Sequence, residues 1–243
     1  MKLSLITINR NNRSGLKRTL DSIASQLPHI KDKCEFEHIV VDGESTDGSL
    51  SELLPELNSV VVVSPPKGVY DAINEGLRHV TGDVVGLLHS GDVFHADNIL
   101  PLVLDVFKKE PETDYVYGNV ILGHRNYVGD KFDENTLAEG YAPPHPSLYV
   151  RRKVVDKIGF YDDTFRVAAD FDYFVRIARD KSLHGRYLPV PMVRMETGGL
   201  STKLYNRIFV NNKEKIRSLR KNGLRSGYFR ILKHYLKIVK SYI

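Results

Sequence analysis

The sequence has little cysteine, no long hydrophobic run and almost no acid near its C-terminus. Its 243 residues include one cysteine, Cys34, which excludes an internal disulfide framework and fits a reducing compartment. The first apolar run, Leu3 to Ile8, is shorter than the hydrophobic region of a secretory leader. No apolar stretch approaches the roughly 20 residues of a membrane span. We therefore expect a soluble, cytoplasmic protein.

Positive charge is concentrated at the C-terminal end. The chain carries a net charge of +5, yet residues 203–243 hold 12 Lys and Arg and one acid, Glu214. The tail therefore carries +11 and residues 1–202 carry −6. An acidic body with a basic tail argues against a nucleic-acid binder and favours a tail with its own anionic partner.

From Tyr228 to Tyr242, apolar residues recur at helical spacing with basic residues between them. This pattern predicts a basic amphipathic helix that holds the protein peripherally at an anionic membrane surface, here the inner face of the cell membrane. A helix packed on the body or on a partner subunit is the alternative.

Strand and helix patterns alternate through the first 110 residues, which predicts parallel βαβ units and an α/β fold. We expect strands at 3–8, 36–41, 60–64 and 83–88, and helices at 14–27, 48–57, 70–80 and 97–110. Right-handed crossovers place the loops after successive strands on one edge of a sheet. The loops 7–12, 42–49, 64–70 and 89–92 would therefore face one crevice.

The pattern is less regular after Pro111. It predicts strands at 115–122 and 148–150, helical segments at 154–158 and 171–179, and a long loop at 132–146. An edge strand is expected at 186–196, because Pro189 and Pro191 are tolerated there. We interpret residues 111–202 as structure laid against residues 1–110, followed by the basic helical tail at 203–243.

Carboxylates follow two of the expected strands, and a third acidic group lies in a later loop. Turns at the carboxyl ends of buried strands are where open α/β sheets hold ligands. Asp42 is placed to accept a hydrogen bond from a nucleoside base or a ribose hydroxyl, and Thr7 and Asn9 would line the same pocket. Simple termination of the first strand is the alternative for Thr7 and Asn9.

Asp92 is the candidate metal ligand, and Ser90 and Gly91 before it are candidates for binding the nucleotide sugar. Mg²⁺ and Mn²⁺ prefer oxygen, and Mg²⁺ commonly takes one or two carboxylates and completes its shell with phosphates and water. Such a cation would neutralise charge on a departing diphosphate. An ordinary turn aspartate is the alternative.

Two further acidic segments supply candidates. Asp71 and Asn74 lie three residues apart at the start of an expected helix, so both would face the crevice, with helix capping as the alternative for Asp71. Asp170 is our candidate general base, because the two alanines before it allow close approach of a substrate hydroxyl. Asp172 would cap the helix or orient its neighbour, and His145 is a weaker candidate base.

Five motifs together resemble the family-2 bacterial glycosyltransferases, over residues 1–202 and closest to the branch used in colanic acid, exopolysaccharide and O-antigen assembly. They are Val-Asp-Gly-x-Ser-x-Asp-Gly, Gly-Val-Tyr-Asp-Ala-Ile-Asn-Glu-Gly, Leu-Leu-x-Ser-Gly-Asp, His-Pro-Ser-Leu-Tyr-Val-Arg-Arg and Ala-Asp-Phe-Asp-Tyr. The resemblance implies a GT-A fold, in which a mostly parallel, Rossmann-like sheet is flanked by helices. It also implies inversion at the anomeric carbon and a divalent cation, with Asp42 for the nucleoside, Asp92 for the metal and Asp170 as base.

The partners implied are a UDP-, GDP- or dTDP-linked sugar and a polyprenyl-diphosphate-linked glycan. Residues 1–110 would then be the nucleotide-binding half and 111–202 the acceptor-side half of one catalytic domain. One departure bears on the cation. Many relatives have Asp-Ser-Asp-Asp where this chain has His89-Ser90-Gly91-Asp92, which leaves a metal-independent reaction as the alternative.

Two other functions are alternatives. A non-catalytic sugar-nucleotide-binding protein is favoured by His89 and Gly91, which replace carboxylates. A phosphohydrolase of the haloacid dehalogenase type needs an Asp-x-Asp pair, and Asp42 is followed by Gly43-Glu44.

Overall fold

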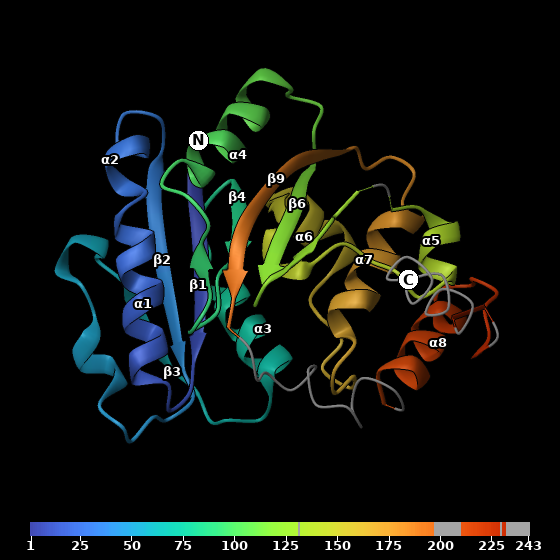
Figure 1. Cartoon of the computed structure of the whole chain (residues 1–243), viewed down its shortest axis with the longest axis horizontal. Helices are drawn as coiled ribbons and strands as arrows, with labels where there is room; N and C mark the ends of the chain where they lie inside the picture. Colours follow the sequence, from blue (N-terminus) through green and yellow to red (C-terminus); the bar gives the residue numbers. More distant parts are fainter. Residues whose placement is uncertain (131, 197–209, 229, 232–243) are drawn as a thin grey trace.

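The computed structural model describes residues 1–130, 132–196, 210–228 and 230–231 (Figure 1). A single mixed sheet runs through the molecule in the order β3-β2-β1-β4-β8-β6-β9-β5, with β7 paired to β6. The strands β1 to β4 are parallel, as are β6 and β9, while β8 and β5 run antiparallel to their neighbours. The α/β class with a mostly parallel sheet flanked by helices is confirmed.

The first half follows the predicted alternation closely. Its strands are β1 (Lys2–Asn9), β2 (Glu35–Asp42), β3 (Val60–Val63) and β4 (Val84–Leu87). Its helices are α1 (Arg13–Ala24), α2 (Leu27–Ile30), α3 (Val69–His79) and α4 (Ile99–Lys109). The helix α1 begins after Asn12, whose side chain accepts a bond from the Gly15 N–H, and not after Ser14. The helix α1 ends at Ala24, before Pro28, which lies in the first turn of α2.

The helix predicted at 48–57 is wrong. The segment forms two short 3₁₀ turns, η1 (Ser49–Glu52) and η2 (Pro55–Leu57), separated by extended backbone at Leu53 and Leu54. Leu54 precedes Pro55, and the proline ring disfavours helical geometry in the residue before it. The leucine spacing in this segment therefore reflects packing of two turns and not one helix.

The second half is built on the same sheet. It contains β5 (Val93–Phe94), β6 (Tyr115–Leu122), β7 (Arg125–Tyr127), β8 (Tyr149–Arg151) and β9 (Gly185–Met195), with α5 (Glu134–Ala138), η3 (His145–Ser147), α6 (Arg152–Ile158) and α7 (Ala169–Arg179). The expected loop at 132–146 holds α5, whose five residues are too few to show a periodic pattern but carry a capping box at Asp133.

The strand expected at 186–196 is not simply an edge strand. It lies between β6 and β5. The short strand β5 pairs only with Val193 and Arg194, near the end of β9. Its prolines are accommodated by an irregularity, since Gly118 pairs with Leu188 whereas Asn119 pairs with Pro191. A bulge of this kind removes the need for proline N–H groups in the ladder.

Two hydrophobic clusters cover the two faces of the sheet. One packs α1 and α4 against β1 through residues such as Leu5, Leu16 and Leu100. The other packs α3, α6 and α7 through residues such as Ile6, Ile73 and Phe174. Alternation along β1 sends Leu5 to one cluster and Ile6 to the other, which fixes the register of the sheet between its helices.

The helix α8 (Asn211–Lys221) lies beside α7 at one end of the molecule (Figure 1). Among the residues that the structure describes, no helix is long and apolar enough to cross a membrane. Most of the amphipathic helix expected from Tyr228 onward, namely residue 229 and residues 232–243, lies outside the described residues.

Candidate active site

A cavity of about 750 Å³ opens at the carboxyl ends of the central strands. All four loops that were predicted to face one crevice contribute to it, which confirms that expectation. Two segments from the second half complete it, the turn before α7 and the end of β9. The lining residues from these two segments are Arg166, Val167, Asp170, Met195 and Glu196, and those from the four loops include Asn9, Asn12, Gly43, Pro65, Tyr70, His89, Ser90 and Asp92.

Asp42 braces the loop after β2. Its carboxylate is buried, with one oxygen 2.7 Å from the Ser45 N–H and the other 2.8 Å from both the Asn9 amide nitrogen and the Ser45 hydroxyl. Its neighbours Val41 and Gly43 line the cavity, as does Asn9. A carboxylate accepts about four hydrogen bonds, so three internal donors leave room for one more.

Asp92 lies at the base of the cavity, beside the end of β9. It is 7% exposed, and its Oδ1 accepts a 3.0 Å bond from the backbone N–H of Glu196. Burial, reinforced by the nearby Glu196 charge, raises the pKa of Asp92 to about 7. Gly91 has a φ of +104°, which residues with a side chain rarely adopt, and a Cβ there would displace the Glu196 carboxylate.

Glu196 is a site residue that the sequence analysis missed. Its carboxylate accepts from Arg18 Nη2 at 2.6 Å and from the Asn12 amide at 3.3 Å, which ties the end of β9 to α1. The available signal was its place as the last residue of the expected strand, where a carboxylate points toward the same sheet edge as Asp92. Within the described parts of the chain, no three acidic, histidine or cysteine side chains gather as a ready-made metal cage.

Asp170 faces the cavity from the first turn of α7. It is half-buried, and its Oδ1 accepts from the Phe171 N–H at 2.8 Å and from the Tyr70 hydroxyl at 3.2 Å. Burial raises the pKa of Asp170, while the Phe171 N–H, the Lys215 charge and the Tyr70 hydroxyl act in the opposite direction. Tyr70 was also missed, although it lies within the quoted motif that begins at Gly68.

Two stacked histidines, one in the cavity wall and one behind it, are neutral. Burial lowers the pKa of His89 to about 3 and that of His145 to about 4. Their rings stack at 6.3 Å, and His145 Nε2 lies 2.7 Å from the Tyr161 hydroxyl. The structure therefore places His89 in the cavity wall and His145 in a buried hydrogen bond that positions Tyr161.

Five residues expected at the crevice are not among the described residues that line it, namely Thr7, Asp42, Asp71, Asn74 and Gly91. The Thr7 hydroxyl instead lies 3.0 Å from Nε2 of the buried His38. The Asn74 side chain bonds both backbone groups of Tyr161, at 2.8 and 2.9 Å, which fastens α3 to the segment before α7. Asp71 lies in the first turn of α3, where a negative charge is favourable to the helix.

The sequence and the fold agree with a single class of proteins. Residues 4–178 match the family described as Glycosyl transferase family 2. A PGL/p-HBAD biosynthesis glycosyltransferase of Mycobacterium tuberculosis is 32% identical over 216 residues, which cover 85% of this chain and 82% of that protein. This chain therefore belongs to glycosyl transferase family 2 and is a glycosyltransferase.

Solved structures share the fold. The crystal structure of S. aureus TarS 1-349 in complex with UDP-GlcNAc superposes with a TM-score of 0.72 at 17% identity, covering 93% of this chain and 68% of that one. The mannosyltransferase PcManGT from Pyrobaculum calidifontis, in complex with GDP-Man and Mn²⁺, gives 0.66 at 19% identity, with 88% and 64% covered. The GT-A architecture is thereby confirmed.

Proposed function

We propose that this cavity transfers a sugar from a nucleoside diphosphate to a hydroxyl of a lipid-linked glycan, with inversion at the anomeric carbon. The observation that carries the proposal is the convergence of Asp170 with the loop that bears Asp92 on one cavity formed by the strand-end loops. Structural relatives support the donor class, since TarS was solved with UDP-GlcNAc and PcManGT with GDP-Man.

The donor lies against the strand-end loops in this proposal. Val41, Pro65 and Val69 give an apolar surface on which a base can pack. The Asn9–Asp42–Ser45 hydrogen bonds hold the loop after β2 rigid beneath it, with one acceptor position on Asp42 left for a base N–H or a ribose hydroxyl. Ser90 and the backbone at Gly91 would lie along the diphosphate.

The side-chain atoms available as metal ligands near Asp92 fit a divalent cation. The carboxylates of Asp92 and the nearby Glu196 both line the cavity and offer oxygen, the ligand atom that Mg²⁺ and Mn²⁺ prefer. A carboxyl whose pKa burial raises to about 7 is costly to ionise unless a positive charge compensates it. A cation bound there would neutralise the diphosphate as it leaves. PcManGT was solved with Mn²⁺, which supports this assignment.

Asp170 takes the proton from the acceptor hydroxyl. Its Oδ1 is held by Phe171 and Tyr70, so we assign Oδ2 as the oxygen that accepts the proton. Burial moves its pKa upward toward the working pH, which is the direction that favours a general base. A base on the α7 side, facing a donor on the loop side, suits attack from the face opposite the leaving diphosphate.

The proposed acceptor is inferred from the C-terminal tail and not from residues that line the cavity. The net charge of +11 over residues 203–243 would hold the enzyme at an anionic leaflet, where a polyprenyl-diphosphate-linked glycan is found. Residues 1–110 then form the nucleotide-binding half, 111–202 the acceptor-side half and 203–243 the membrane-proximal tail of an enzyme of exopolysaccharide or O-antigen assembly.

The test is transfer from a panel of UDP-, GDP- and dTDP-sugars in the presence of membrane lipid extract. We expect one donor to be consumed, with a lipid-soluble product whose anomeric configuration, read by NMR, is opposite to that of the donor. Retention of configuration would refute the inverting mechanism. Donor binding without turnover on any extract would favour the non-catalytic alternative.

A further inference from the structure

The helix that carries Asp170 has no cap of its own. The residue at its N-cap position is Ala168, which has no side-chain acceptor for the free N–H groups of the turn. Glu214 on α8 instead binds the backbone that leads into the helix. Its Oε1 accepts from the Arg166 N–H at 2.9 Å, and its Oε2 accepts from Val167 at 2.9 Å and from Ala168 at 3.0 Å. One carboxylate thus gathers three consecutive N–H groups beside the cavity.

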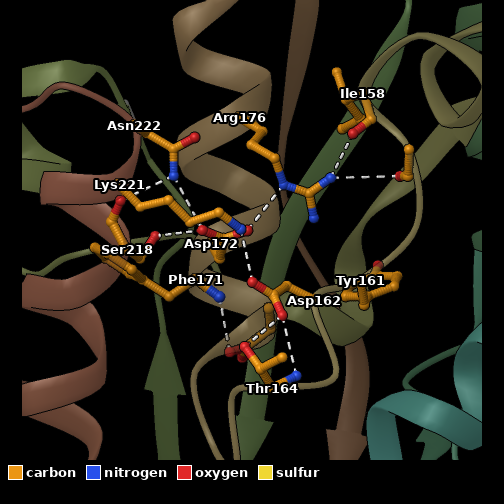
Figure 2. A network of polar contacts seen from close by, with 12 residues as sticks. Ile158, Tyr161, Asp162, Thr164, Phe171, Asp172, Arg176, Ser218, Lys221 and Asn222 are labelled. Atoms are coloured by element: carbon orange, nitrogen blue, oxygen red, sulfur yellow. Dashed lines mark hydrogen bonds and ion pairs between the residues drawn. The ribbon is translucent and has the colours of Figure 1, made fainter.

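A second carboxylate joins the same two helices one turn further along α7. Asp172 is fully buried. Its Oδ1 accepts from the Ser218 hydroxyl of α8 at 2.8 Å and from the side-chain amide of Asn222, the residue after α8, at 3.0 Å (Figure 2). Its Oδ2 accepts from Arg176 Nε at 2.9 Å, and Arg176 also donates to the Ile158 carbonyl (Figure 2). Hydrogen bonds to buried charged groups are among the strongest in proteins.

The next residue of α8 acts on Asp170 electrostatically. Lys215 Nζ donates to the Gly140 carbonyl at 2.6 Å and lies 5.1 Å from the centre of the Phe171 ring. Its positive charge opposes the effect of burial and so lowers the pKa of Asp170. Asp170 lies between Ala168, which Glu214 binds, and Asp172, which binds α8. The contacts between α7 and α8 and the Lys215 charge therefore act on both sides of Asp170.

Basic residues of α8 are also engaged with the body of the protein. Arg217 stacks on the Phe165 ring, with its guanidinium 4.0 Å from the ring centre, and bonds Thr164. Lys221 pairs with Asp162 at 2.6 Å. These contacts place part of the tail's positive charge at an intramolecular interface, so α8 is not simply a cationic surface for a membrane.

We infer that α8 holds the turn bearing Asp170 in its working position and that Glu214 is a positioning residue for this base. The inference rests on the proposed function, in which Asp170 takes the acceptor proton. General-base catalysis needs the carboxylate within hydrogen-bond reach of the hydroxyl, and a displacement of about 1 Å costs about 100-fold in rate. The donor loops belong to other strands, so donor binding should be insensitive to Glu214.

The test compares Glu214→Ala, Glu214→Gln and a matched control, Glu112→Ala, at an exposed glutamate outside the site. We expect Glu214→Ala to lower kcat by about 10- to 100-fold with donor Kd changed less than about twofold. Glu214→Gln keeps one acceptor oxygen and should fall between Glu214→Ala and the wild type. Glu112→Ala should match the wild type. A merely structural role would instead lower donor affinity and kcat together.

Hydrogen–deuterium exchange gives a readout that does not need turnover. The amides of residues 166–168 should exchange faster in Glu214→Ala, while the loop at 89–92 keeps its wild-type rate. If Glu214→Ala fails to fold, Ser218→Ala is the second variant, because it removes one hydrogen bond to Asp172. We expect it to give a smaller fall in kcat, again with donor Kd unchanged. A folded Glu214→Ala variant with wild-type kcat would overturn the inference. Absence of turnover in the wild type would refute the proposed function, and unchanged exchange at 166–168 would then still refute the positioning role.

Discussion

The two walls of the cavity are built in different ways. The loop wall comes from segments that each follow a parallel strand, and these segments bind one another, as Asp42 after β2 binds Asn9 at the end of β1. The α7 wall comes from a turn and a strand end that are held by residues far along the chain, as Arg166 is by Glu214. The donor side is therefore held largely by contacts among segments of the first 110 residues, whereas the side that carries the base depends on α8.

Removing the base should have the largest effect on activity. Asp170→Asn keeps the shape of the side chain but cannot accept a proton, so transfer should fall by about 10²- to 10⁴-fold. Donor affinity should stay near that of the wild type, because Asp170 acts on the acceptor. Transfer assays with the variant at saturating donor measure this. Retained turnover in Asp170→Asn together with loss in Asp172→Asn would move the base by two residues.

Removing the proposed metal ligand should have the next largest effect, on the loop wall. Asp92→Ala should abolish the tightening of nucleoside-diphosphate binding by Mn²⁺, because the carboxylate at the base of the cavity is lost. Titration calorimetry with and without Mn²⁺ on both proteins measures this. Wild-type binding that ignores the cation would remove the metal assignment and support a metal-independent reaction.

The pH dependence of transfer should reflect the ionisation of Asp170 on the α7 wall. Asp170 must be ionised to act as base, and burial raises its pKa above the ordinary value of 3.8. Activity should therefore be present above this raised pKa and be lost as the pH falls through it. Lys215→Gln removes a charge that lowers this pKa, so its acid limb should move to higher pH. A pH profile of kcat for both proteins checks the direction, and a shift to lower pH would contradict it.

The smallest effect on catalysis should come from the end of the tail. Deleting residues 232–243 removes Lys233, Lys237 and Lys240, each worth about 1 kcal/mol near an anionic leaflet, and should weaken vesicle binding by about 100-fold. Nucleotide binding should be preserved, and binding of the intact protein should weaken with salt. Co-sedimentation with anionic vesicles measures this, and equal sedimentation of both forms would refute the membrane assignment.

A longer deletion, from Ser226 onward, provides a contrast. Ile231 is only 2% exposed and packs against Gly140, and Ser226 donates to the Ala138 carbonyl. Losing this buried side chain should lower the free energy of unfolding by about 2 kcal/mol or more. Denaturant unfolding of the two truncated forms measures how much the segment from Ser226 to Ile231 contributes to stability.

The sequence predicted which loops form the loop wall, but it did not predict the contacts that hold the α7 wall. Strand and helix periodicity with right-handed crossovers brought the four loops together, and Asp92 and Asp170 were both found beside the cavity. Thr7 and Asn74 do not line the cavity, because Thr7 lies against the buried His38 and Asn74 bonds the backbone of Tyr161 from α3. A single sequence cannot show which way such a side chain turns.

The missed residues share a different cause. Glu196 and Glu214 act across long separations in the chain, so no local spacing marks them. Glu214 was counted as the one acid of a basic tail, and its isolation there was the only available signal. The two 3₁₀ turns at 49–57 were missed because leucine spacing suited a helix, and the effect of Pro55 on Leu54 outweighed it.

Donor affinity in Asp42→Ala and Asp170→Asn is the most direct test of the division between the two walls. Titration calorimetry with the donor that the panel identifies should show at least about tenfold weaker binding for Asp42→Ala, with or without Mn²⁺, since a hydrogen bond to a charged group contributes about 1.5–3 kcal/mol. Asp170→Asn should bind the donor within about twofold of the wild type while transferring almost no sugar. Weak donor binding in Asp170→Asn, or wild-type binding in Asp42→Ala, would contradict the account.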